Sequence, residues 1–380
     1  MEKLLHRNEQ LKKDNMQVSF IDLKRQYFLH KEEILSAIDK VLSSGSYILG
    51  EMVETFEKKI AEYLGCRFAL GVANGTDALI LAFKSAGIGH TDEVILPTNS
   101  FLATAGAVIA VGAKPLLCDV KQDLNIDVDA AESLITKNTK AIIPVHLTGR
   151  PAEMDKIETL AKRHSLMVIE DAAQSIGARY KNQMTGSIGD VGCFSLHPLK
   201  NLRVYGDGGL VATNNEELYA TMKLLRNHGL VNRDTCLRFG LNSRLDSIQA
   251  GIALAELPHL EKWNHHRRYM AGIYRERLKD VLEVPIDKTD EHAVYHNFVV
   301  LTDQRDSLMK FLLNKGVETK IHYPVPIHLQ PAAASLGHKL GDFPVAEKLA
   351  MQMLSLPIYA ELREDELNYT VDAILEFFKR

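Results

Sequence analysis

The chain has 380 residues, of which 46% are hydrophobic and 25% are charged, as in soluble globular proteins large enough to bury a sizeable core. The formal net charge of -4 argues against a nucleic-acid-binding protein. The four scattered cysteines, with no C-x-x-C pair, argue against a disulfide framework or a zinc knuckle, and no apolar run is long enough to span a membrane. The first residues lack the apolar centre of a signal peptide, so we expect a cytoplasmic protein.

Residues 1–16 are rich in charged and amide side chains, which predicts a frayed helix or tail. After them, short apolar segments alternate with segments of helical periodicity. The predicted strands are 68–72, 93–96, 115–119, 141–145, 166–170, 191–195 and 209–213. The helices predicted between them include 76–84, 103–111 and 154–164. Short apolar strands separated by helices indicate an α/β fold with a mainly parallel sheet covered on both faces.

The character of the chain changes after residue 258. A long charged helix is predicted from about 260 to 278, followed by a strand at 297–301 and a helix at 305–315. A proline-rich loop then begins at His322. We therefore expect a large domain at 17–258 and a smaller C-terminal α+β domain at 259–380.

Two positions near predicted strand ends suggest cofactor contacts. Gly75 and Thr76 occupy a strand-to-helix turn, where backbone N–H groups at a helix N-terminus can hold a phosphate. The same residues also suit an ordinary Asn-Gly turn with a threonine cap. Phe101 follows the strand 93–96 and could either stack on a flat ring or pack in the core.

Asp171 ends the predicted strand 166–170, at the position where open α/β sheets bind their ligands. A carboxylate there can pair with a protonated pyridine nitrogen, or it can cap the following segment. Gln174 follows one turn later and could hydrogen-bond the hydroxyl region of such a ring, or lie on the surface.

Lys200 lies between an apolar run and the glycine-rich loop 206–209. Held in a cleft, a lysine with a lowered pKa is nucleophilic, whereas in an exposed loop it is a solvated charge. Ser195 could donate to a phosphate or could be a small buried strand residue. A reactive amine and a strand-end acid are the two groups that a pyridoxal phosphate enzyme needs.

The histidines leave alternatives open. His146 follows the strand 141–145 and could contact the substrate or the cofactor, or be a hydrogen-bonded core residue. His259, His265 and His266 cluster on the charged helix. Because no His-Glu-x-x-His pattern occurs, we read that cluster as a solvated face and expect no metal site.

Several motifs together give a family resemblance. They are Asn-Gly-Thr-Asp-Ala at 74–78, Pro-Val-His-Leu-Thr-Gly at 144–149, Glu-Asp-Ala-Ala-Gln-Ser-Ile-Gly at 170–177, the stretch 194–209, Gly-Leu-Asn-Ser-Arg at 240–244 and His-Tyr-Pro-Val-Pro at 322–326. The set resembles the DegT/DnrJ/EryC1/StrS family of sugar aminotransferases from about residue 20 to the C-terminus. The resemblance implies a fold-type I transferase that uses pyridoxal 5'-phosphate.

The same resemblance implies a role for each candidate residue. Lys200 would carry the cofactor, and Asn242 would reach the phosphate bound in a neighbouring subunit, so that the active site requires a homodimer. His322 and His328 would lie in a loop near the sugar. The residues that contact the phosphate would be Gly75, Thr76 and Ser195. The residues that contact the ring would be Phe101, Asp171 and Gln174.

The implied activity is transfer of an amino group from an amino acid, with glutamate as the expected donor, to a keto sugar. Family dehydratases carry histidine at the position of Lys200, so the lysine favours transamination. The segment around Lys200 resembles members that aminate nucleotide-linked 3-keto sugars, but its Leu-His-Pro-Leu form leans toward sugar phosphates or free sugars. A cofactor-binding regulator or a dehydratase-like member without transaminase turnover is the alternative.

Overall fold

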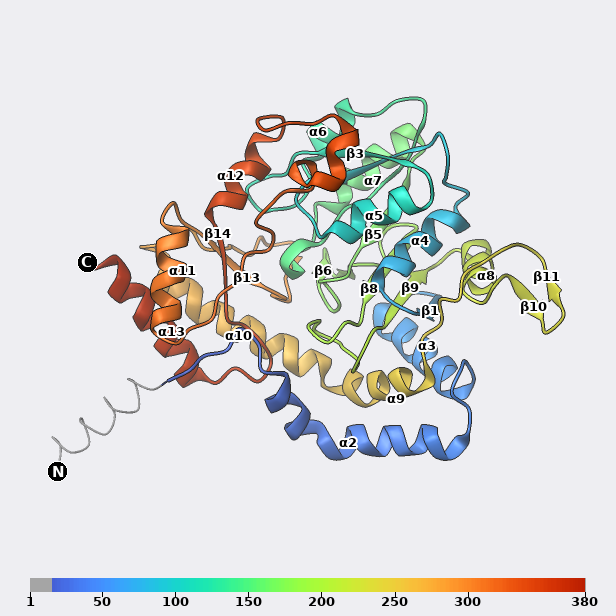
Figure 1. The fold of residues 1–380 in the computed structure, drawn as a ribbon, viewed down its shortest axis with the longest axis horizontal. Coiled ribbons are helices and arrows are strands. Elements are labelled where there is room, and N and C mark those ends of the chain that lie inside the picture. The colour runs from blue at the N-terminus through green and yellow to red at the C-terminus, as the bar shows by residue number, and fades with distance from the viewer. Residues whose placement is uncertain (1–15, 380) are drawn as a thin grey trace.

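The computed structural model describes residues 16–379, so the tail expected at 1–16 lies almost wholly outside the described residues. Its centre is a seven-stranded sheet in the order β1-β9-β8-β5-β4-β2-β3 (Figure 1). All neighbouring strands are parallel except at β9, which runs antiparallel to both of its neighbours. The expected mainly parallel α/β sheet is confirmed. In chain order its strands are β1 (Phe68–Val72), β2 (Glu93–Pro97), β3 (Lys114–Cys118), β4 (Thr139–Ile142), β5 (Met167–Asp171), β8 (Val191–Ser195) and β9 (Gly209–Thr213).

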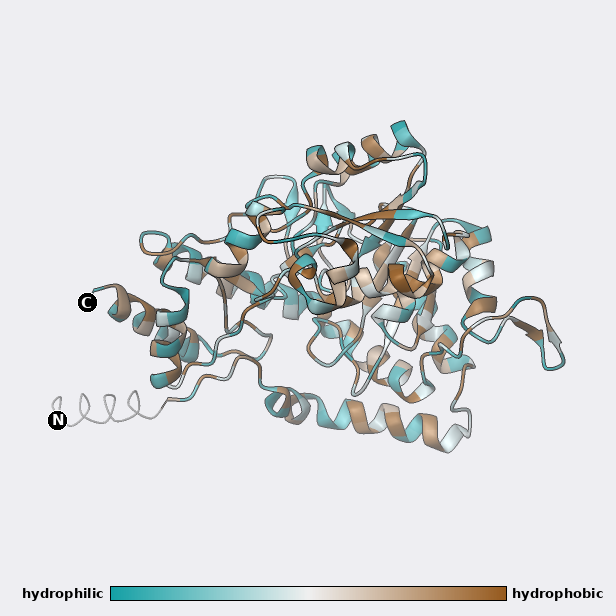
Figure 2. Cartoon of the chain, turned by 45° about the horizontal axis from the view of Figure 1, so that its top comes forward, coloured by the Kyte–Doolittle hydropathy of each residue, from teal (hydrophilic) through white to brown (hydrophobic). Residues whose placement is uncertain are grey.

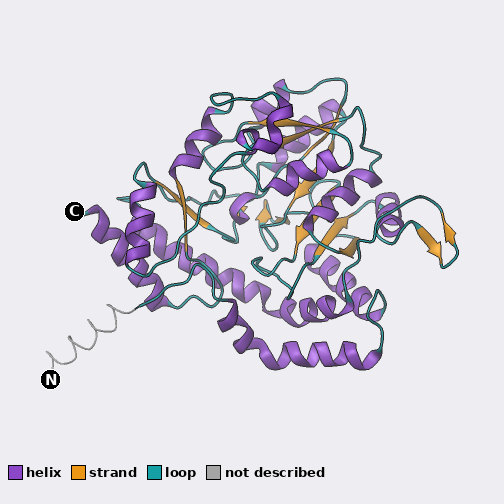
Figure 3. Cartoon of the chain, viewed as in Figure 1, coloured by secondary structure: helices purple, strands orange, loops and turns teal. Residues whose placement is uncertain are grey.

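The central strands are apolar because both faces of the sheet are covered. Successive side chains point to opposite faces, so that in β2 Val94 and Leu96 enter one core and Ile95 enters another. Helices pack on both sides, as Figure 3 shows. They are α3 (Glu51–Leu64), α4 (Gly75–Ser85), α5 (Leu102–Ala110), α6 (Val128–Ser133), α7 (Met154–His164), α8 (Glu216–Leu225) and α9 (Ser247–Glu256), while α2 (Leu23–Ser44) lies outside α9.

The strand predicted at 141–145 is shorter and earlier in the structure, where β4 ends at Ile142. Pro144 interrupts the ladder because proline has no N–H to donate. Its carbonyl still accepts from the Asp171 N–H at 2.9 Å, and Val145 forms an isolated bridge with Asp171. These contacts of Pro144 and Val145 therefore hold the end of β5 in place, although β4 does not continue as far as these residues.

The C-terminal part forms a second core that draws on residues 270–374 together with Val18. Val299 and Leu301, however, pack into the core of the large sheet. The boundary at 258/259 falls within the short 3-10 helix η2 (Leu257–His259) and stays a prediction. The elements here are α10 (Leu260–Leu278), β12 (Glu291–His292), β13 (Phe298–Leu301), α11 (Arg305–Asn314), α12 (Pro344–Gln352), β14 (Met353–Leu356) and α13 (Glu364–Phe378).

Helix α2 packs against α9 along one edge of the molecule (Figure 1). Its apolar and polar residues alternate in bands along its length in Figure 2, as expected of an amphipathic helix. Among the described residues, no helix combines the length and apolar character needed to cross a membrane.

Candidate functional site

The carboxyl ends of the parallel strands bring the predicted residues to one edge of the sheet. Gly75 follows β1, Asp171 ends β5 and Ser195 ends β8. Because parallel strands all end at the same edge, these residues come together although 120 residues separate the first from the last. Gly209 begins the antiparallel strand β9 and therefore reaches the same edge, where it pairs with Ser195.

The first turn of α4 forms a cradle for an anion. The side chain of Asn74 accepts from the Asp77 N–H at 2.9 Å, which leaves the N–H groups of Gly75 and Thr76 without a partner inside the helix. A Cβ atom added at Gly75 would lie 2.9 Å from the Cβ of Ser195. The bare backbone therefore lies directly against the serine, and the helix N-terminus and the serine hydroxyl can hold one phosphate.

We predict that Gly75→Ala weakens the binding of a phosphate-bearing cofactor by at least about tenfold, or about 1.4 kcal/mol. The added methyl group would force the helix N-terminus and the strand end apart. A fluorescence titration with pyridoxal phosphate measures the loss, and pyridoxal without the phosphate should lose less affinity. Gly272→Ala is the matched control, because nothing lies within 4 Å of a Cβ added there. Equal affinity in the two variants would contradict the assigned cradle.

Asp171 provides a buried negative charge at the same edge. Its carboxylate accepts from the Thr104 hydroxyl at 2.8 Å and from the Ala173 N–H at 3.2 Å. Burial raises the pKa of Asp171, and these hydrogen bonds together with the charge of Lys200 oppose the increase. A desolvated carboxylate of this kind favours a cationic partner, such as a protonated ring nitrogen.

Lys200 supplies the reactive amine. Burial lowers the pKa of Lys200 to about 8, with the charge of Asp171 acting in the opposite direction. An amine with this pKa is partly neutral near physiological pH, and only the neutral form attacks a carbonyl or accepts a proton. The loop behind it is anchored by Asn201, which is buried and donates to Asn264 at 2.8 Å and to the Val294 carbonyl at 3.2 Å.

Gln174 and Phe101 lie beside a tyrosine that the sequence did not single out. The Gln174 carbonyl oxygen accepts from the Thr148 N–H at 2.8 Å, and its amide nitrogen donates to the Tyr323 hydroxyl at 3.1 Å. The ring of Phe101 lies 5.6 Å from that of Tyr323 and is 54% exposed. A face of Phe101 therefore remains free to stack on a flat ligand. Only the Tyr-Pro pair in the family-like motif at 322–326 could have suggested Tyr323 from the sequence.

The structure places two of the three candidate histidines in internal networks. The ring of His146 is fully buried, with Nε2 2.8 Å from Glu170 and Nδ1 accepting from the Ala152 N–H at 3.0 Å. His328 bonds Thr98 at 2.8 Å and Glu347 at 2.9 Å through its two ring nitrogens. Neither ring has a nitrogen left for a substrate, so both side chains fit the role of hydrogen-bonded core residues.

His322 lies closer to the reactive amine. Burial, followed by the charges of Lys200 and Lys320, lowers the pKa of His322 to about 4, so this ring is neutral at physiological pH. Its Nδ1 lies 2.9 Å from the Ser355 hydroxyl. His296, which belongs to no recognisable motif, is a second neutral ring there, since burial and Lys200 lower its pKa well below the usual value.

Asn242 is exposed, and no contact in residues 16–379 joins it to Asp171 or Lys200. It follows the hairpin of β10 (Leu230–Asn232) and β11 (Thr235–Cys236), which protrudes from the body of the molecule (Figure 1). Phe239, at the base of the hairpin, is 98% exposed. The structure of one chain thus leaves both side chains available to another molecule.

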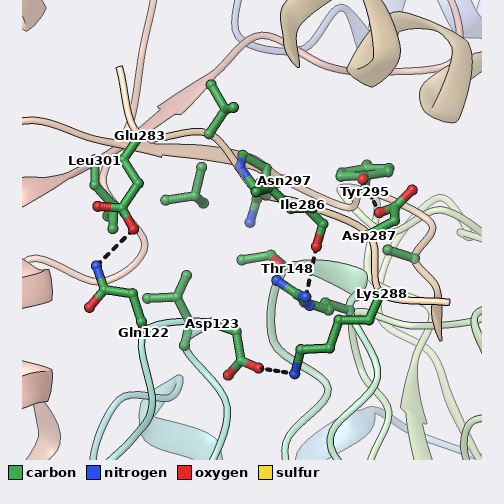
Figure 4. A pocket seen from close by; sticks show the side chains of 16 residues that line it. Gln122, Asp123, Thr148, Glu283, Ile286, Asp287, Lys288, Tyr295, Asn297 and Leu301 are labelled. Carbon is green, nitrogen blue, oxygen red and sulfur yellow. Dashed lines mark hydrogen bonds and ion pairs between the residues drawn. The ribbon is translucent and has the colours of Figure 1, made fainter. Parts of the chain in front are cut away.

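A cavity of about 250 Å³ lies next to the candidate site residues, since Thr148, whose N–H donates to Gln174, is part of its lining (Figure 4). Thr148, Asn297 and the loop 283–288 contribute to its lining. Its charged groups are paired within the protein, as in the 3.0 Å contact between Lys288 and Asp123. None of the predicted site residues lines it, so the candidate site is defined by its chemistry and not by this cavity.

Comparison with known proteins shows which family the chain resembles over most of its length. The chain matches the model of the DegT/DnrJ/EryC1/StrS aminotransferase family over residues 29–375. It is 42% identical to a pleiotropic regulatory protein of Geobacillus stearothermophilus, over 96% of this chain and 99% of that one. It is 43% identical to a UDP-N-acetyl-3-dehydro-alpha-D-glucosamine 3-aminotransferase of Acidithiobacillus ferrooxidans, over 93% and 96% of the two chains.

Two solved structures share the fold. DesV of S. venezuelae, solved in complex with a ketimine intermediate, superposes with a TM-score of 0.94 at 41% identity, covering 96% of this chain and 99% of that one. The ntda protein of Bacillus subtilis, solved with bound cofactor pmp, gives a TM-score of 0.90 at 33% identity, covering 97% and 87%. Both relatives span nearly the whole of this chain.

Proposed function

Because the chain belongs to the DegT/DnrJ/EryC1/StrS aminotransferase family, we propose that it moves an amino group from glutamate to a keto sugar. The observation that carries the proposal is that the buried amine of Lys200, with its lowered pKa, and the buried carboxylate of Asp171 at the end of β5 act on each other electrostatically. Such a pair is what amino-group chemistry on a pyridine aldehyde requires.

The residues present fit pyridoxal phosphate. The N-terminus of α4 and Ser195 would hold its phosphate, Phe101 would cover one face of the ring, and Asp171 would meet the ring nitrogen. When bound, this cofactor supplies a conjugated ring that delocalises the electron pair left by proton removal.

The chain itself supplies proton transfer and position. Because the pKa of Lys200 is about 8, its amine can take a proton from the donor carbon at physiological pH and deliver it to a second carbon, the one that was the aldehyde carbon of the cofactor. Thr104 and the Ala173 N–H hold the carboxylate of Asp171 in one orientation. Gln174 fixes the Tyr323 hydroxyl at the side of the same site. These groups orient the reacting atoms before substrate arrives.

For the acceptor, we propose a nucleotide-linked 3-keto sugar, which the name of the Acidithiobacillus relative supports. The test uses glutamate to load the enzyme and then presents a UDP-linked 3-keto sugar, a keto sugar phosphate and a free keto sugar separately. Return of the starting absorbance only with the UDP-linked sugar is expected. If the starting absorbance returns only with the sugar phosphate, the proposed acceptor is wrong but the aminotransferase activity is retained as the conclusion. Failure of glutamate to release 2-oxoglutarate would favour a regulatory cofactor-binding protein.

We further propose a homodimer in which Asn242 completes the site of the partner. The exposed Asn242 and the 98% exposed Phe239 support a contact at this hairpin. Lys200→Ala and Asn242→Ala proteins should each be weakly active, whereas a refolded equimolar mixture should regain about a quarter of wild-type activity, because half the dimers contain one intact site.

The control for this mixture is Lys200→Ala with Asp171→Asn. Lys200 and Asp171 belong to the site of the same chain, so each site in a mixed dimer lacks one of the two side chains and none is intact. Turnover before and after mixing, with subunit exchange followed by mass spectrometry, measures the result. Recovery in the control, or none in the first mixture despite exchange, would contradict a shared site.

A further inference from the structure

Three side chains with metal-binding donors meet on the surface, away from the candidate active site. His30 and Glu33 lie one turn apart on α2, and His259 ends the 3-10 helix η2. One donor atom from each residue lies within 4.8 Å of the other two. The His259 Nε2 is 2.7 Å from a Glu33 carboxylate oxygen, and the rings of His30 and His259 are 4.6 Å apart between centroids. The cluster therefore joins two segments separated by 226 residues in sequence.

The donor set has the composition of a transition-metal site. Two imidazoles and one carboxylate are ligands that Zn²⁺ accepts, with bonds of about 2.0–2.2 Å and a water in the fourth position. Residues three apart on a helix share a face, so His30 and Glu33 can bind one ion together. The side chain of Glu33 is 53% exposed, so it can rotate to close the remaining distance, and the cluster is open to solvent.

The platform behind the cluster is rigid. The buried indole of Trp263 stacks on His259 at 5.6 Å, and its ring lies 5.2 Å from that of His30. The guanidinium of Arg203 covers Trp263 at 5.1 Å. A fixed layer of this kind holds both imidazoles in place, as the outer shell of a metal site does.

A surface ion pair alone does not account for this arrangement. The contact between Glu33 and His259 needs only two side chains, and an exposed pair contributes little to stability. The second imidazole, packed against the first, adds a donor that the ion pair does not use. An ion held by all three residues accounts for each of them.

We propose that His30, Glu33 and His259 bind one divalent transition-metal ion of the zinc type, which clamps α2 to the start of α10. The ion would replace the proton shared between His259 and Glu33. In the sequence, the absence of a His-Glu-x-x-His pattern argues against a metal site, and His30 and Glu33 become neighbours of His259 only when the chain folds. The proposal is independent of the aminotransferase reaction.

The test uses the cofactor-loaded full-length protein after chelator treatment. Competition with a chromophoric chelator should show one tight Zn²⁺ per chain, and Co²⁺ should give the visible absorption of a four- or five-coordinate site. His259→Ala and Glu33→Gln should each weaken Zn²⁺ binding by at least about tenfold, and the rise in melting temperature with Zn²⁺ should disappear. His265→Ala, which replaces an exposed histidine of α10, is the control and should bind as the wild type does.

Two outcomes would overturn the site. One is wild-type protein that binds no stoichiometric Zn²⁺. The other is Zn²⁺ binding that His259→Ala and His265→Ala leave equally strong, which would assign the ion to another place, such as the bound cofactor. Because the readouts are affinity, spectrum and melting temperature, loss of aminotransferase activity alone would not affect the conclusion.

Discussion

Lys200→Ala is expected to lower kcat by roughly 10²–10⁴-fold or more, the contribution of a positioned acid–base group. Lys200 is the buried amine whose charge acts on Asp171 and whose pKa burial lowers. Alanine would remove the amine that we propose both to carry the cofactor and to move the proton. Single-turnover release of 2-oxoglutarate from glutamate separates this chemical step from product release.

Lys181→Ala is the matched control, since Lys181 is a surface lysine paired with Asp155 at 2.9 Å. Its activity should equal that of the wild type. Borohydride reduction of the cofactor-loaded wild type, followed by peptide mapping, should place the added mass on Lys200 and on no other lysine. A Lys200→Ala protein that turns over at more than about a tenth of the wild-type rate would refute the assigned role, since proton transfer alone is worth more.

The strands could be predicted well because their apolar runs are short and bounded by turns. β1, β8 and β9 begin and end where the sequence predicts, and α7 and α10 also match. β4 differs because a single proline overrides an otherwise apolar pattern. The local pattern of apolar residues therefore predicts where strands and helices form, and a proline within such a pattern shows where a strand ends early.

The site was predictable only in part. Asp171, Ser195 and Gly75 lie at strand ends, a position that the order of elements reveals. His146 follows a predicted strand in the same way, and the family resemblance suggests His328, yet the ring nitrogens of both are taken up by Glu170, Thr98 and other internal partners. No sequence rule distinguishes these cases, because the distinction depends on partners far along the chain. His30, Glu33 and His259 illustrate the same limit, since only tertiary packing makes them neighbours.

Asp171→Asn is expected to lower kcat by at least about 10²-fold, because it removes the charge that we propose keeps the ring nitrogen protonated while leaving the shape of the side chain. The amide can keep the contact with Thr104, whose hydroxyl also lies 2.7 Å from that of Ser100 and can turn to accept. The cofactor should still bind, so the variant should have a lower kcat while the fraction of protein that holds the cofactor stays the same. Asp127→Asn, at the start of α6, is the control, since asparagine also caps helices.

Stability should change in the opposite direction to activity. The folded-state pKa of Asp171 is raised by burial, so ionisation of this acid destabilises the fold above that pKa, and the penalty fades as the pH falls through it. Asp171→Asn removes the ionisation. The cofactor-free variant should therefore melt at a higher temperature than cofactor-free wild type at pH 8, and the difference should shrink as the pH is lowered from the raised pKa toward that of an unfolded aspartic acid. A variant that loses both stability and activity at pH 8 would show that Asp171 is needed for the fold, and the cofactor role would lose its physical basis.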